Sequence, residues 1–414
     1  MDISTLSNMV NTDAAIRRRQ KLQPVGGQGD KIFPPTYPGE GRNAPPQHVF
    51  ERRRLKEQGA VESKDVWCVL VDSVQSQANR LEESLLAAIA DGLRIPHVVV
   101  DFSEAKLDGI TRITSLDAPH RVYDAILRDS LHNKIPFPES EIGKRLTKAK
   151  LEDASALLEV SPTALLFGAW HSTGEGGGLG AKFARCIVSE IVGVGVPVDE
   201  IVDPRTGEVN VKTAARRPGS RMDPLGVLRK VEVFKGESGW DTSEKGAGKK
   251  AARVRPSEIN HGNIAPSIDD LGATCDHIEH SFVLSFAALR RLRFGSEQKN
   301  KAARALLAAL GLVAVAEQDA RGYALRSRCD LVCDGRSPLH LVKSDGTTAD
   351  IDVDREKAKA LYNAALGDAK KAGFELLSDP LVLSPQNKLV EIVRRSQELA
   401  LSGAGGENND SGQP

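Results

Sequence analysis

The sequence has few aromatic residues and no net charge. Phe, Trp and Tyr make up 4% of the 414 residues, and 56 Lys and Arg balance 56 Asp and Glu. A chain with so few aromatic rings is not expected to stack extensively on nucleobases. Because the overall charge is balanced, any contact with nucleic acid must come from local basic patches that meet phosphate or ribose.

Long apolar runs are also missing. No stretch approaches the length of a membrane span, and the first residues lack the apolar core of a signal peptide. We therefore expect a cytoplasmic protein with no membrane partner. The five cysteines form no C-x-x-C pair, which favours reduced, structural thiols.

What the sequence does contain is a glycine-rich stretch at residues 164–193, which reads ALLFGAWHSTGEGGGLGAKFARCIVSEIVG. Its apolar residues 165–167 favour a buried strand, and the apolar positions after residue 181 recur at helical spacing. We therefore predict a strand, a glycine loop and a helix. The N–H groups and the dipole of that helix would face the loop beside Lys182 and Arg185, which is the outline of an anion site.

Other interpretations of the loop remain open. A Walker loop fails, because Ala181 replaces its second glycine and Phe183 replaces its Ser or Thr. Gly176, Gly178 and Ala181 fit the dinucleotide pattern G-x-G-x-x-A, although further residues separate them from the predicted strand. A nucleotide- or dinucleotide-dependent enzyme that uses loop 174–180 is therefore the alternative function. A surface loop without any chemistry is the simplest interpretation.

The chain divides into segments by composition. Residues 1–62 form a basic arm, rich in Pro and Gly, that we expect to be partly irregular. Residues 103–161 are polar and weakly periodic, which is typical of an insertion. Residues 205–255 are basic and loop-like, with 13 Lys and Arg against six Asp and Glu. Residues 402–414 form a tail that is disordered by composition.

Hydrophobic periodicity predicts the remaining elements. The expected strands are residues 66–71, 98–102, 277–286, 312–316 and 323–332, together with a hairpin that pairs 209–211 with 227–234. The expected helices are residues 77–90, 122–131, 287–294, 299–310, 354–371 and 388–401. Both types of element recur along the chain.

Two polar segments have more hydrogen-bonding side chains than their elements need. Between strand 66–71 and helix 77–90, some of these side chains cap the helix and the others are free to contact ribose or phosphate. Residues 253–267, RVRPSEINHGNIAPS, should be extended, with polar groups unspent on local structure. The side chains concerned are Asp72, Ser73, Gln75, Ser76, Gln77, Asn79 and Arg80 in the first segment, and Arg253, Arg255, Asn260, His261 and Asn263 in the second.

Catalytic patterns are absent from the sequence. Cys275, His277 and His280 do not have the spacing of a zinc motif, and a strand would place the two histidines on opposite faces. Ser189 and His171 form no recognisable triad, and no G-x-S-x-G elbow exists. We therefore expect a protein that is not an enzyme and that uses no metal ion or cofactor.

Five ordered stretches carry a family resemblance. They are LVDSVQSQANRLE at residues 70–82, RVYDAILRDS at 121–130, the glycine-rich stretch from FGAW to EIVG, RVRPSEINHGNIAPS, and FAALRRLRF at 286–294. Together they resemble the backbone subunit of the type I-U, or I-G, CRISPR surveillance complex Cascade, a member of the RAMP superfamily. The resemblance covers about residues 60–335.

The resemblance implies an α+β fold with a modified RRM-like, or ferredoxin-like, palm. The palm would span residues 63–335 and carry finger-like and thumb-like insertions at about 103–161 and 205–255. Residues 336–401 would add a C-terminal helical segment. The aromatic stacking motifs of an RRM are absent from the sequence, so we do not transfer them.

The resemblance also implies a function. Such subunits are non-catalytic, bind guide crRNA through its backbone whatever its sequence, and stack as a helical filament for recognition of target DNA in antiviral defence. The expected partners are guide crRNA, target DNA, further copies of the chain and other Cascade subunits. The candidate RNA contacts are Ser73, Gln75, Ser76, Gln77, Asn79, Arg80, His171, Ser172, Thr173, Gly176, Gly177, Gly178, Lys182, Arg185, Arg216, Arg217, Arg253, Arg255, Asn260, His261 and Asn263.

Overall fold

The computed structural model describes residues 1–39, 46–56, 62–171, 182–202, 209–213, 217–269 and 271–401. The chain forms two compact units, each assembled from separate stretches. Unit 1 comprises Met1–Gln28, Leu70–Val194 and His277–Pro414, and unit 2 comprises Gly29–Val69 and Gly195–Asp276. Helices and antiparallel strands are mixed, so the fold class is α+β, as predicted. Within the described residues, no helix combines the length and the apolar character that crossing a bilayer requires.

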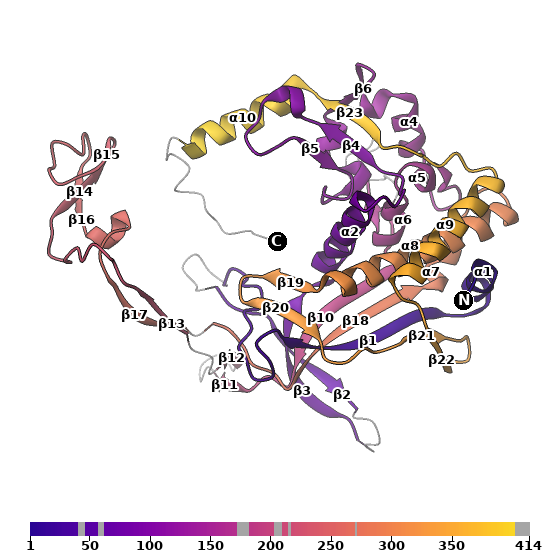
Figure 1. Ribbon diagram of the computed structural model, residues 1–414, viewed down its shortest axis with the longest axis horizontal. Helices are drawn as coiled ribbons and strands as arrows, with labels where there is room; N and C mark the ends of the chain where they lie inside the picture. Colours follow the sequence, from indigo (N-terminus) through magenta and orange to yellow (C-terminus); the bar gives the residue numbers. More distant parts are fainter. Residues whose placement is uncertain are drawn as a thin grey trace. The chain divides into compact units, whose positions relative to one another are not determined.

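A curled antiparallel sheet forms the centre of unit 1 (Figure 1). Its strands are β1 (Ala15–Pro24), the end of β3 (Lys64–Asp72) from Leu70 onward, β10 (Ile187–Val194), β18 (His277–Ser285), β19 (Tyr323–Arg326), β20 (Cys329–Cys333), β21 (Leu339–Val342) and β22 (Thr348–Ile351). They lie in the order β19-β20-β1-β18-β10-β3, and β21 pairs with both β1 and β22. Every second residue of β18 is buried, because strand side chains alternate between the two faces of a sheet. His277 and His280 accordingly lie on opposite faces, as predicted.

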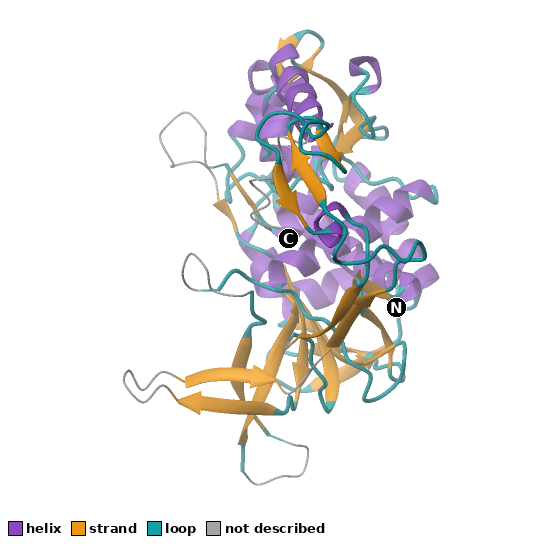
Figure 2. Cartoon of the chain, turned by 90° about the vertical axis from the view of Figure 1, so that its left-hand side faces the viewer, coloured by secondary structure: helices purple, strands orange, loops and turns teal. Residues whose placement is uncertain are grey.

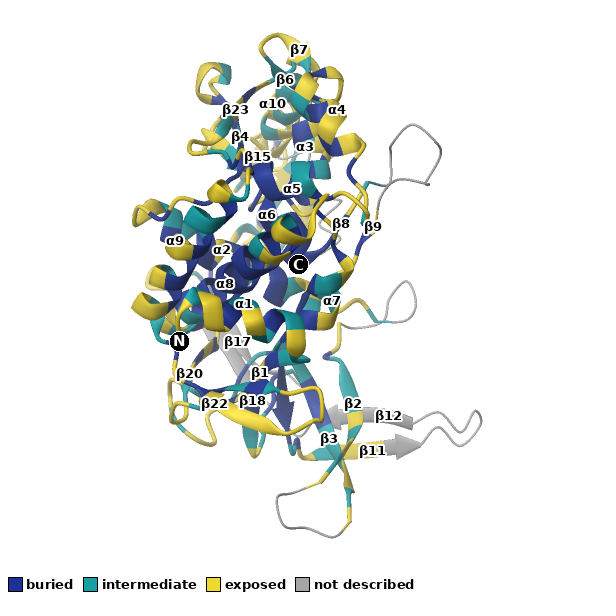
Figure 3. Ribbon diagram, turned by 90° about the vertical axis from the view of Figure 1, so that its right-hand side faces the viewer, coloured by how far each residue is buried: buried dark blue, intermediate teal, exposed yellow. Residues whose placement is uncertain are grey.

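Helices cover the buried face of this sheet (Figures 1 and 2). They are α1 (Ile3–Thr12), α2 (Val74–Ala90), α7 (Phe286–Arg291), α8 (Glu297–Arg321) and α9 (Arg355–Lys371). The middle of α8, from Ala303 to Val315, is buried all round, as expected of a helix enclosed by other elements. Figure 3 shows the buried positions, in dark blue, gathered on α2, α6 and α8.

A second, smaller layer of unit 1 holds most of the predicted finger region. Its sheet has the order β5-β4-β23-β6-β7, and α10 follows β23 directly. The strands are β4 (Val98–Asp101), β5 (Arg112–Thr114), β6 (Ser130–His132), β7 (Ile135–Pro136) and β23 (Leu381–Pro385). The helices are α3 (Ala125–Arg128), α4 (Glu141–Thr147), α5 (Ser155–Val160), α6 (Pro162–Phe167) and α10 (Asn387–Leu401). The C-terminal segment is therefore not purely helical, because β21, β22 and β23 belong to it.

Unit 2 consists of short antiparallel pairs. Its strands are β2 (Phe50–Leu55), which pairs with β3, then β11 (Val198–Val202) and β12 (Val209–Thr213), β13 (Arg217–Arg221) and β17 (Ile264–Asp269), and β14 (Val233–Gly236), β15 (Gly239–Asp241) and β16 (Ala252–Val254). The last three form a small sheet, which Figure 1 shows at the end of the ribbon made by β13 and β17. The predicted pairing of residues 209–211 with 227–234 is wrong, because β12 pairs with β11 and β14 pairs with β15 and β16.

The predicted order of strand, glycine loop and helix is also wrong. Residues 165–167 end α6, which begins at Pro162, a residue favoured in the first turn of a helix. The chain after the glycines forms β9 (Lys182–Phe183) and then β10. Positions spaced by four satisfy either period in so short a run, and the β-branched Ile and Val residues of β10 favour a strand. The helix N-terminus that the predicted anion site required is therefore not present after residue 181.

Two further predictions need correction. Residues 312–316, expected as a strand, continue α8, because a short apolar run is typical of a buried helix as well as of a strand. The first 24 residues, expected within a partly irregular arm, form α1 and β1, and β1 pairs with β18, β20 and β21. The basic triplet 17–19 misled the prediction, because its side chains alternate between the interior and solvent.

Most of the longer elements were predicted correctly. The strands expected at 66–71, 98–102 and 277–286 are β3, β4 and β18, and residues 323–332 form the hairpin of β19 and β20. The helices expected at 77–90, 287–294, 299–310, 354–371 and 388–401 are α2, α7, the first part of α8, α9 and α10. Residues 122–131 contain only the short helix α3. The predicted tail at 402–414 lies outside the described residues.

Candidate functional site

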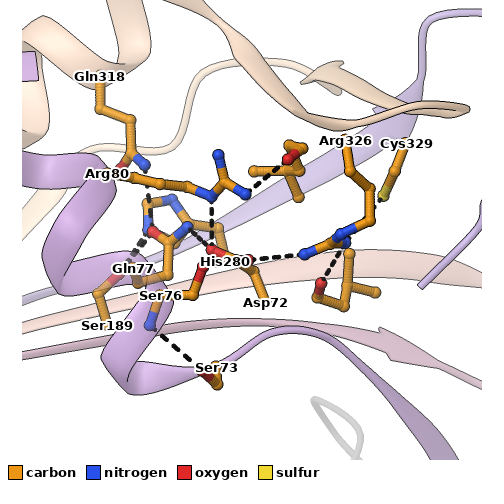
Figure 4. A network of polar contacts seen from close by, with 12 residues as sticks. Asp72, Ser73, Ser76, Gln77, Arg80, Ser189, His280, Gln318, Arg326 and Cys329 are labelled. Atoms are coloured by element: carbon orange, nitrogen blue, oxygen red, sulfur yellow. Dashed lines mark hydrogen bonds and ion pairs between the residues drawn. The ribbon is translucent and has the colours of Figure 1, made fainter. Parts of the chain in front are cut away.

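A buried carboxylate organises the first of the two polar segments. Asp72 ends β3 with its side chain fully buried. Its Oδ1 accepts a hydrogen bond from Ser76 Oγ at 2.8 Å, and its Oδ2 accepts one from Gln77 Nε2 at 2.6 Å. Ser73 caps α2 by accepting from the backbone N–H of Ser76 at 3.2 Å, the usual role of a serine in this position. Figure 4 shows these side chains around Asp72.

Two arginines neutralise Asp72. Arg80 Nε lies 2.9 Å from Oδ2, and Arg326 Nη2 lies 3.0 Å from Oδ1. Each arginine also donates to a backbone carbonyl, Arg80 to that of Leu325 and Arg326 to that of Val71. Their side chains are 21% and 22% exposed, so the two guanidinium groups extend from the buried carboxylate to the surface.

The network continues from Gln77 to the centre of the sheet (Figure 4). Gln77 Oε1 accepts from Gln318 Nε2 of α8 at 3.2 Å, and Ser189 Oγ of β10 lies 3.3 Å from the same oxygen. Ser189 Oγ also lies 2.7 Å from Nε2 of His280 in β18. One glutamine thus links α2 to a helix and to two strands of the sheet.

His280 is fully buried and neutral at ordinary pH. Tyr323 Oη donates to Asp319 Oδ1 at 2.6 Å, so it accepts the proton of His280 Nδ1, 3.1 Å away. Nε2 of the ring is then the acceptor for Ser189. Burial, followed by the nearby charge of Arg18, lowers the pKa of His280 to about 3.

The structure therefore separates the predicted contacts of this segment into inner and outer groups. Gln77 is buried and fully engaged in the network, so it does not face solvent. Gln75 and Asn79 point outward from α2 and are exposed. The half-buried members are Ser73, Ser76 and Arg80.

Within the glycine-rich stretch, the strands of a two-stranded ribbon of unit 1 precede and follow the glycines of residues 174–180. β8 (Ala169–Trp170) pairs with β9, and Trp170 lies opposite Lys182. The ring of His171 stacks on that of Tyr123, with centroids 4.8 Å apart, and burial lowers the pKa of His171. Residues 172–181 lie outside the described residues, and with them the predicted contacts Ser172, Thr173, Gly176, Gly177 and Gly178.

Arg185 follows β9 with a half-buried side chain. Its Nε is buried and has no hydrogen-bond partner among the described residues, where a native protein satisfies nearly every such group. Burial and the charge of Arg121 lower the pKa of Arg185, while Glu82 raises it. The surroundings of this guanidinium are therefore short of an acceptor.

Arg121 and Glu82 form a buried ion pair beneath the ribbon. Arg121 donates to the two carboxylate oxygens at 2.7 and 2.6 Å, and its Nη1 donates to the carbonyl of Gly168 at 2.9 Å. Burial raises the pKa of Glu82 to about 7, and the charge of Arg121 opposes this rise. Gly168 has a φ of +85°, and a Cβ there would lie 3.0 Å from Cγ of Arg185. A single buried carboxylate thus serves two guanidinium groups at the base of the glycine-rich stretch.

In unit 2, the second polar segment is extended at its two ends, which belong to β16 and β17, and is folded in its middle, where an extended segment was predicted. Residues Pro256–Ile259 form a 3-10 helix that ends at Asn260, which has a φ of +61°. Asn263 Oδ1 accepts from the backbone N–H of Asp223 at 2.7 Å, and Asp223 accepts from the N–H of Gly262 at 2.6 Å. These polar groups are therefore spent on local structure, because the turn needs them to satisfy its backbone.

The predicted basic contacts of unit 2 lie in three places. Arg253 is exposed and pairs with Glu232 at 2.6 Å, whereas Arg255 is exposed at the start of the 3-10 helix. Arg217 begins β13, and Arg216 lies outside the described residues. His261 meets Trp240 edge to face, with ring centroids 5.5 Å apart.

Two of the three predicted groups of residues, the first polar segment and the residues beside the glycines, belong to unit 1. α2 carries Gln75 and Asn79 on its exposed side and Gln77 and Glu82 on its buried side, and Glu82 lies near Arg185. The third group belongs to unit 2. Sequence reasoning missed Trp170, Glu82, Arg121 and Arg326. The first three lie inside quoted motifs, but the exposure of Trp170 has no sequence signal, and the ion pairs join residues far apart in the chain.

These features define an α+β protein with an exposed and a half-buried cation, Lys182 and Arg185, directly after the glycines. Residues 16–198, less than half of the chain, match the model of a family described as CRISPR-associated protein GSU0053. The match indicates a CRISPR-associated protein family, and it includes β1, α2 and both flanks of the glycine-rich stretch. No curated protein matches the chain.

Proposed function

We propose that the chain is a backbone subunit of the type I-U/I-G CRISPR Cascade and binds guide crRNA independently of its sequence. In this proposal, the sheet of unit 1 with its helices acts as an RRM-like palm. The observation that carries it is the buried Nε of the half-buried Arg185, which has no hydrogen-bond partner among the described residues, in a chain whose residues 16–198 match a CRISPR-associated family.

A backbone phosphate is the acceptor that this site lacks. Both carboxylate oxygens of Glu82 accept hydrogen bonds from Arg121, so Arg121 and Arg185 share the single negative charge of Glu82. Arginine binds phosphate through its planar fork of N–H donors, and burial strengthens such a charge-assisted bond. Lys182 is exposed on the same ribbon and adds a second cation. Phosphate contacts carry no sequence information, as a guide of variable sequence requires.

Unit 2 has the features expected of a thumb. Residues 205–255 belong to it, and the turns that follow β13 leave three apolar side chains exposed: Met222 at 87%, Leu225 at 73% and Leu228 at 71%. Such exposed apolar groups on a soluble protein mark contact sites. Apolar wedges also insert between stacked bases, and this fits the displacement of guide bases that the family resemblance implies.

The proposed role is non-catalytic. Asp72, at the end of β3, has both carboxylate oxygens occupied by two arginines and two polar side chains. Asp101, at the end of β4, accepts from the backbone N–H and hydroxyl of Ser103, which lower its pKa. Incubation of the RNA-bound protein with complementary RNA or DNA and magnesium should leave both strands intact. Cleavage that Asp101→Ala abolishes would show an enzyme instead.

The alternative function has lost its main support. A dinucleotide or ATP site of the predicted kind needs a helix whose first turn faces the phosphates. The chain after the glycines forms β9 and β10, so that helix is missing from the part of the chain that is described. We therefore favour RNA over a nucleotide cofactor as the ligand of this site.

The remaining partners follow from the same proposal. Target DNA would pair with the bound guide, and further copies of the chain and other Cascade subunits would assemble along it. A filament of this kind works on intracellular guide RNA, which fits the expected cytoplasmic location.

Salt-dependent RNA binding tests the proposal. We expect Lys182→Ala with Arg185→Ala to weaken binding to single-stranded RNAs of unrelated sequence by the same factor. RNA binding releases fewer counterions when a phosphate contact is lost. The slope of log K against log salt should therefore become shallower by about 0.7 for each contact that is removed. A matched control is Lys370→Ala with Lys371→Ala, which removes two exposed cations from the end of α9. Equal slopes for wild type and both double variants would refute the site.

A further inference from the structure

Trp170 is a large aromatic side chain left exposed in a chain that has few of them. Half of its surface, 52%, is open to solvent, although its neighbour Ala169 and the cross-strand Phe183 are buried at 8% and 3%. The backbone of Trp170 is thus fixed by a buried pair, while its ring faces outward. The ring is available for a partner from outside the molecule.

Lys182 orients this ring. Trp170 and Lys182 are directly opposite in the ribbon of β8 and β9, and the ammonium of Lys182 lies over the indole, 5.4 Å from the ring centroid. A cation over one face of an indole is attracted to that face and so restrains the rotation of the ring. The arrangement differs at Trp67, whose Nε1 donates to Glu200 at 2.8 Å and whose ring is covered by Arg52 at 4.8 Å.

The surroundings of Trp170 suit a nucleotide. Arg185, with its unpartnered Nε, packs against Gly168, two residues before the tryptophan. A flat aromatic face, an adjacent ammonium and a nearby guanidinium without an acceptor match the three parts of a nucleotide strand, which are a flat base and the phosphates on either side. Stacking accepts any base, because every base has a π-face.

We propose that the exposed ring of Trp170 stacks on a nucleobase of the bound single strand, while Lys182 and Arg185 contact the flanking phosphates. This inference rests on the proposed RNA-binding function and deepens it, because it adds a base contact to a backbone-binding site. It also limits the expectation drawn from the low aromatic content: stacking is confined to one position and is not extensive. The contact remains independent of base identity.

Tryptophan fluorescence tests this contact directly. The chain has three tryptophans, so the double variant Trp67→Phe, Trp240→Phe leaves Trp170 as the only indole. We expect an oligouridylate to quench this emission on binding, because the base stacks on the ring. An oligonucleotide of the same length with abasic sites should bind, as followed by anisotropy, without quenching. Binding of oligouridylate with unchanged emission would overturn the base contact and leave the proposed function intact.

Substitution of Trp170 separates stacking from charge. Trp170→Ala should weaken RNA binding about tenfold, or about 1.4 kcal/mol, at an unchanged salt slope, and Trp170→Phe should recover part of the loss. The thermal unfolding midpoint should stay the same, because the ring is exposed. Equal affinities of the wild type and the two variants for RNA would show that the ring does not contact a base. A protein partner bound over the ring of Trp170 would contradict the base contact as well. Absence of RNA binding in the wild type would refute the proposed function itself.

Discussion

At the scale of single residues, the feature that most constrains the fold is the line of polar side chains that enters the core from Asp72 to His280. Gln77 donates to Asp72, and Ser189 donates to His280, which Tyr323 joins to Asp319. Oε1 of Gln318, beside Gln77, has no hydrogen-bond partner among the described residues. The members of a buried polar network depend on one another for their hydrogen bonds. A change of protonation at one member therefore disturbs the whole line.

Acid should destabilise the protein through His280. Its pKa is lowered to about 3 in the folded chain and is about 6.5 when unfolded. Protonation is thus favoured in the unfolded state, and the stabilisation present above pH 6.5 is lost as the pH falls toward 3. Between pH 7 and pH 5 this residue should cost about 2 kcal/mol of unfolding free energy.

The control for this prediction is His280→Gln, which keeps a polar side chain that does not titrate. Urea unfolding at several pH values should give a steeper loss of stability toward acid for the wild type than for the variant. Parallel pH profiles for the two proteins would mean that His280 does not carry the acid sensitivity. The variant itself is expected to be less stable at pH 7, so only the difference in slope is informative.

Sequence patterns predicted which polar residues cluster at the start of α2. The same patterns also indicate which of these residues lie on the buried face of the helix. The buried apolar face of α2 includes Ala78, Leu81 and Leu85, and Gln77 lies four residues before Leu81. Helical spacing places Gln77 on that inner face and Gln75 and Asn79 away from it. The partner Arg326 was beyond reach, because 254 residues separate it from Asp72.

At the scale of elements, the errors arose where a short apolar run fits both periods. The residues after the glycines were predicted as a helix from Phe183, Ile187, Val188 and Ile191, and all of these except Val188 are spaced by four. In β10 the same Ile187 and Ile191 are buried because four is also a multiple of two. Residues 312–316 were predicted as a strand but belong to helix α8. A helix that is buried on all sides has no polar face, so its sequence does not show the helical period.

Gly311 shows why α8 accepts a glycine near its middle. A Cβ at this position would lie 3.0 Å from Cδ1 of Ile187 and 3.5 Å from both methyl carbons of Leu284, so the helix backbone approaches β10 and β18 closely. Glycine costs about 1 kcal/mol of helix propensity relative to alanine. The close approach compensates for this cost through packing.

Two substitutions at Gly311 should differ in effect. Gly311→Ala adds one methyl group that the flexible end of Ile187 can yield to, and its better helix propensity offsets the crowding. Gly311→Val adds branches that the sheet cannot accommodate, and should destabilise the protein by about 1–3 kcal/mol. Chemical denaturation of both variants measures the difference. Equal stability of the valine variant and the wild type would show that α8 is free to move away from the sheet.

At the scale of the whole molecule, the sequence could not predict how distant segments join. β1, near the start of the chain, is central in the sheet, and β23, near its end, pairs in parallel with β4. Composition predicts that residues 205–255, a basic and glycine-containing segment, lie outside the core, and these residues belong to unit 2. Pairing of strands hundreds of residues apart has no counterpart in local periodicity.

Assembly is the property of the whole molecule that the proposed function makes testable. Lys and Arg balance Asp and Glu, so a chain with local basic sites must carry compensating acidic surfaces elsewhere. Such a distribution suits a head-to-tail contact between identical copies, which continues along a strand unless the rotation closes a ring. Because binding does not depend on sequence, the length of the RNA alone should determine how many copies bind.

Native mass measurement of the protein on two unrelated RNAs, one twice as long as the other, tests this assembly. The longer RNA should carry about twice as many copies, since each copy covers a fixed number of nucleotides. The Lys182→Ala, Arg185→Ala variant should load fewer copies at the same protein concentration, whereas Lys370→Ala, Lys371→Ala should load as many as the wild type. The same copy number on both RNAs would mean that the assembly closes on itself, and the filament would have to be abandoned.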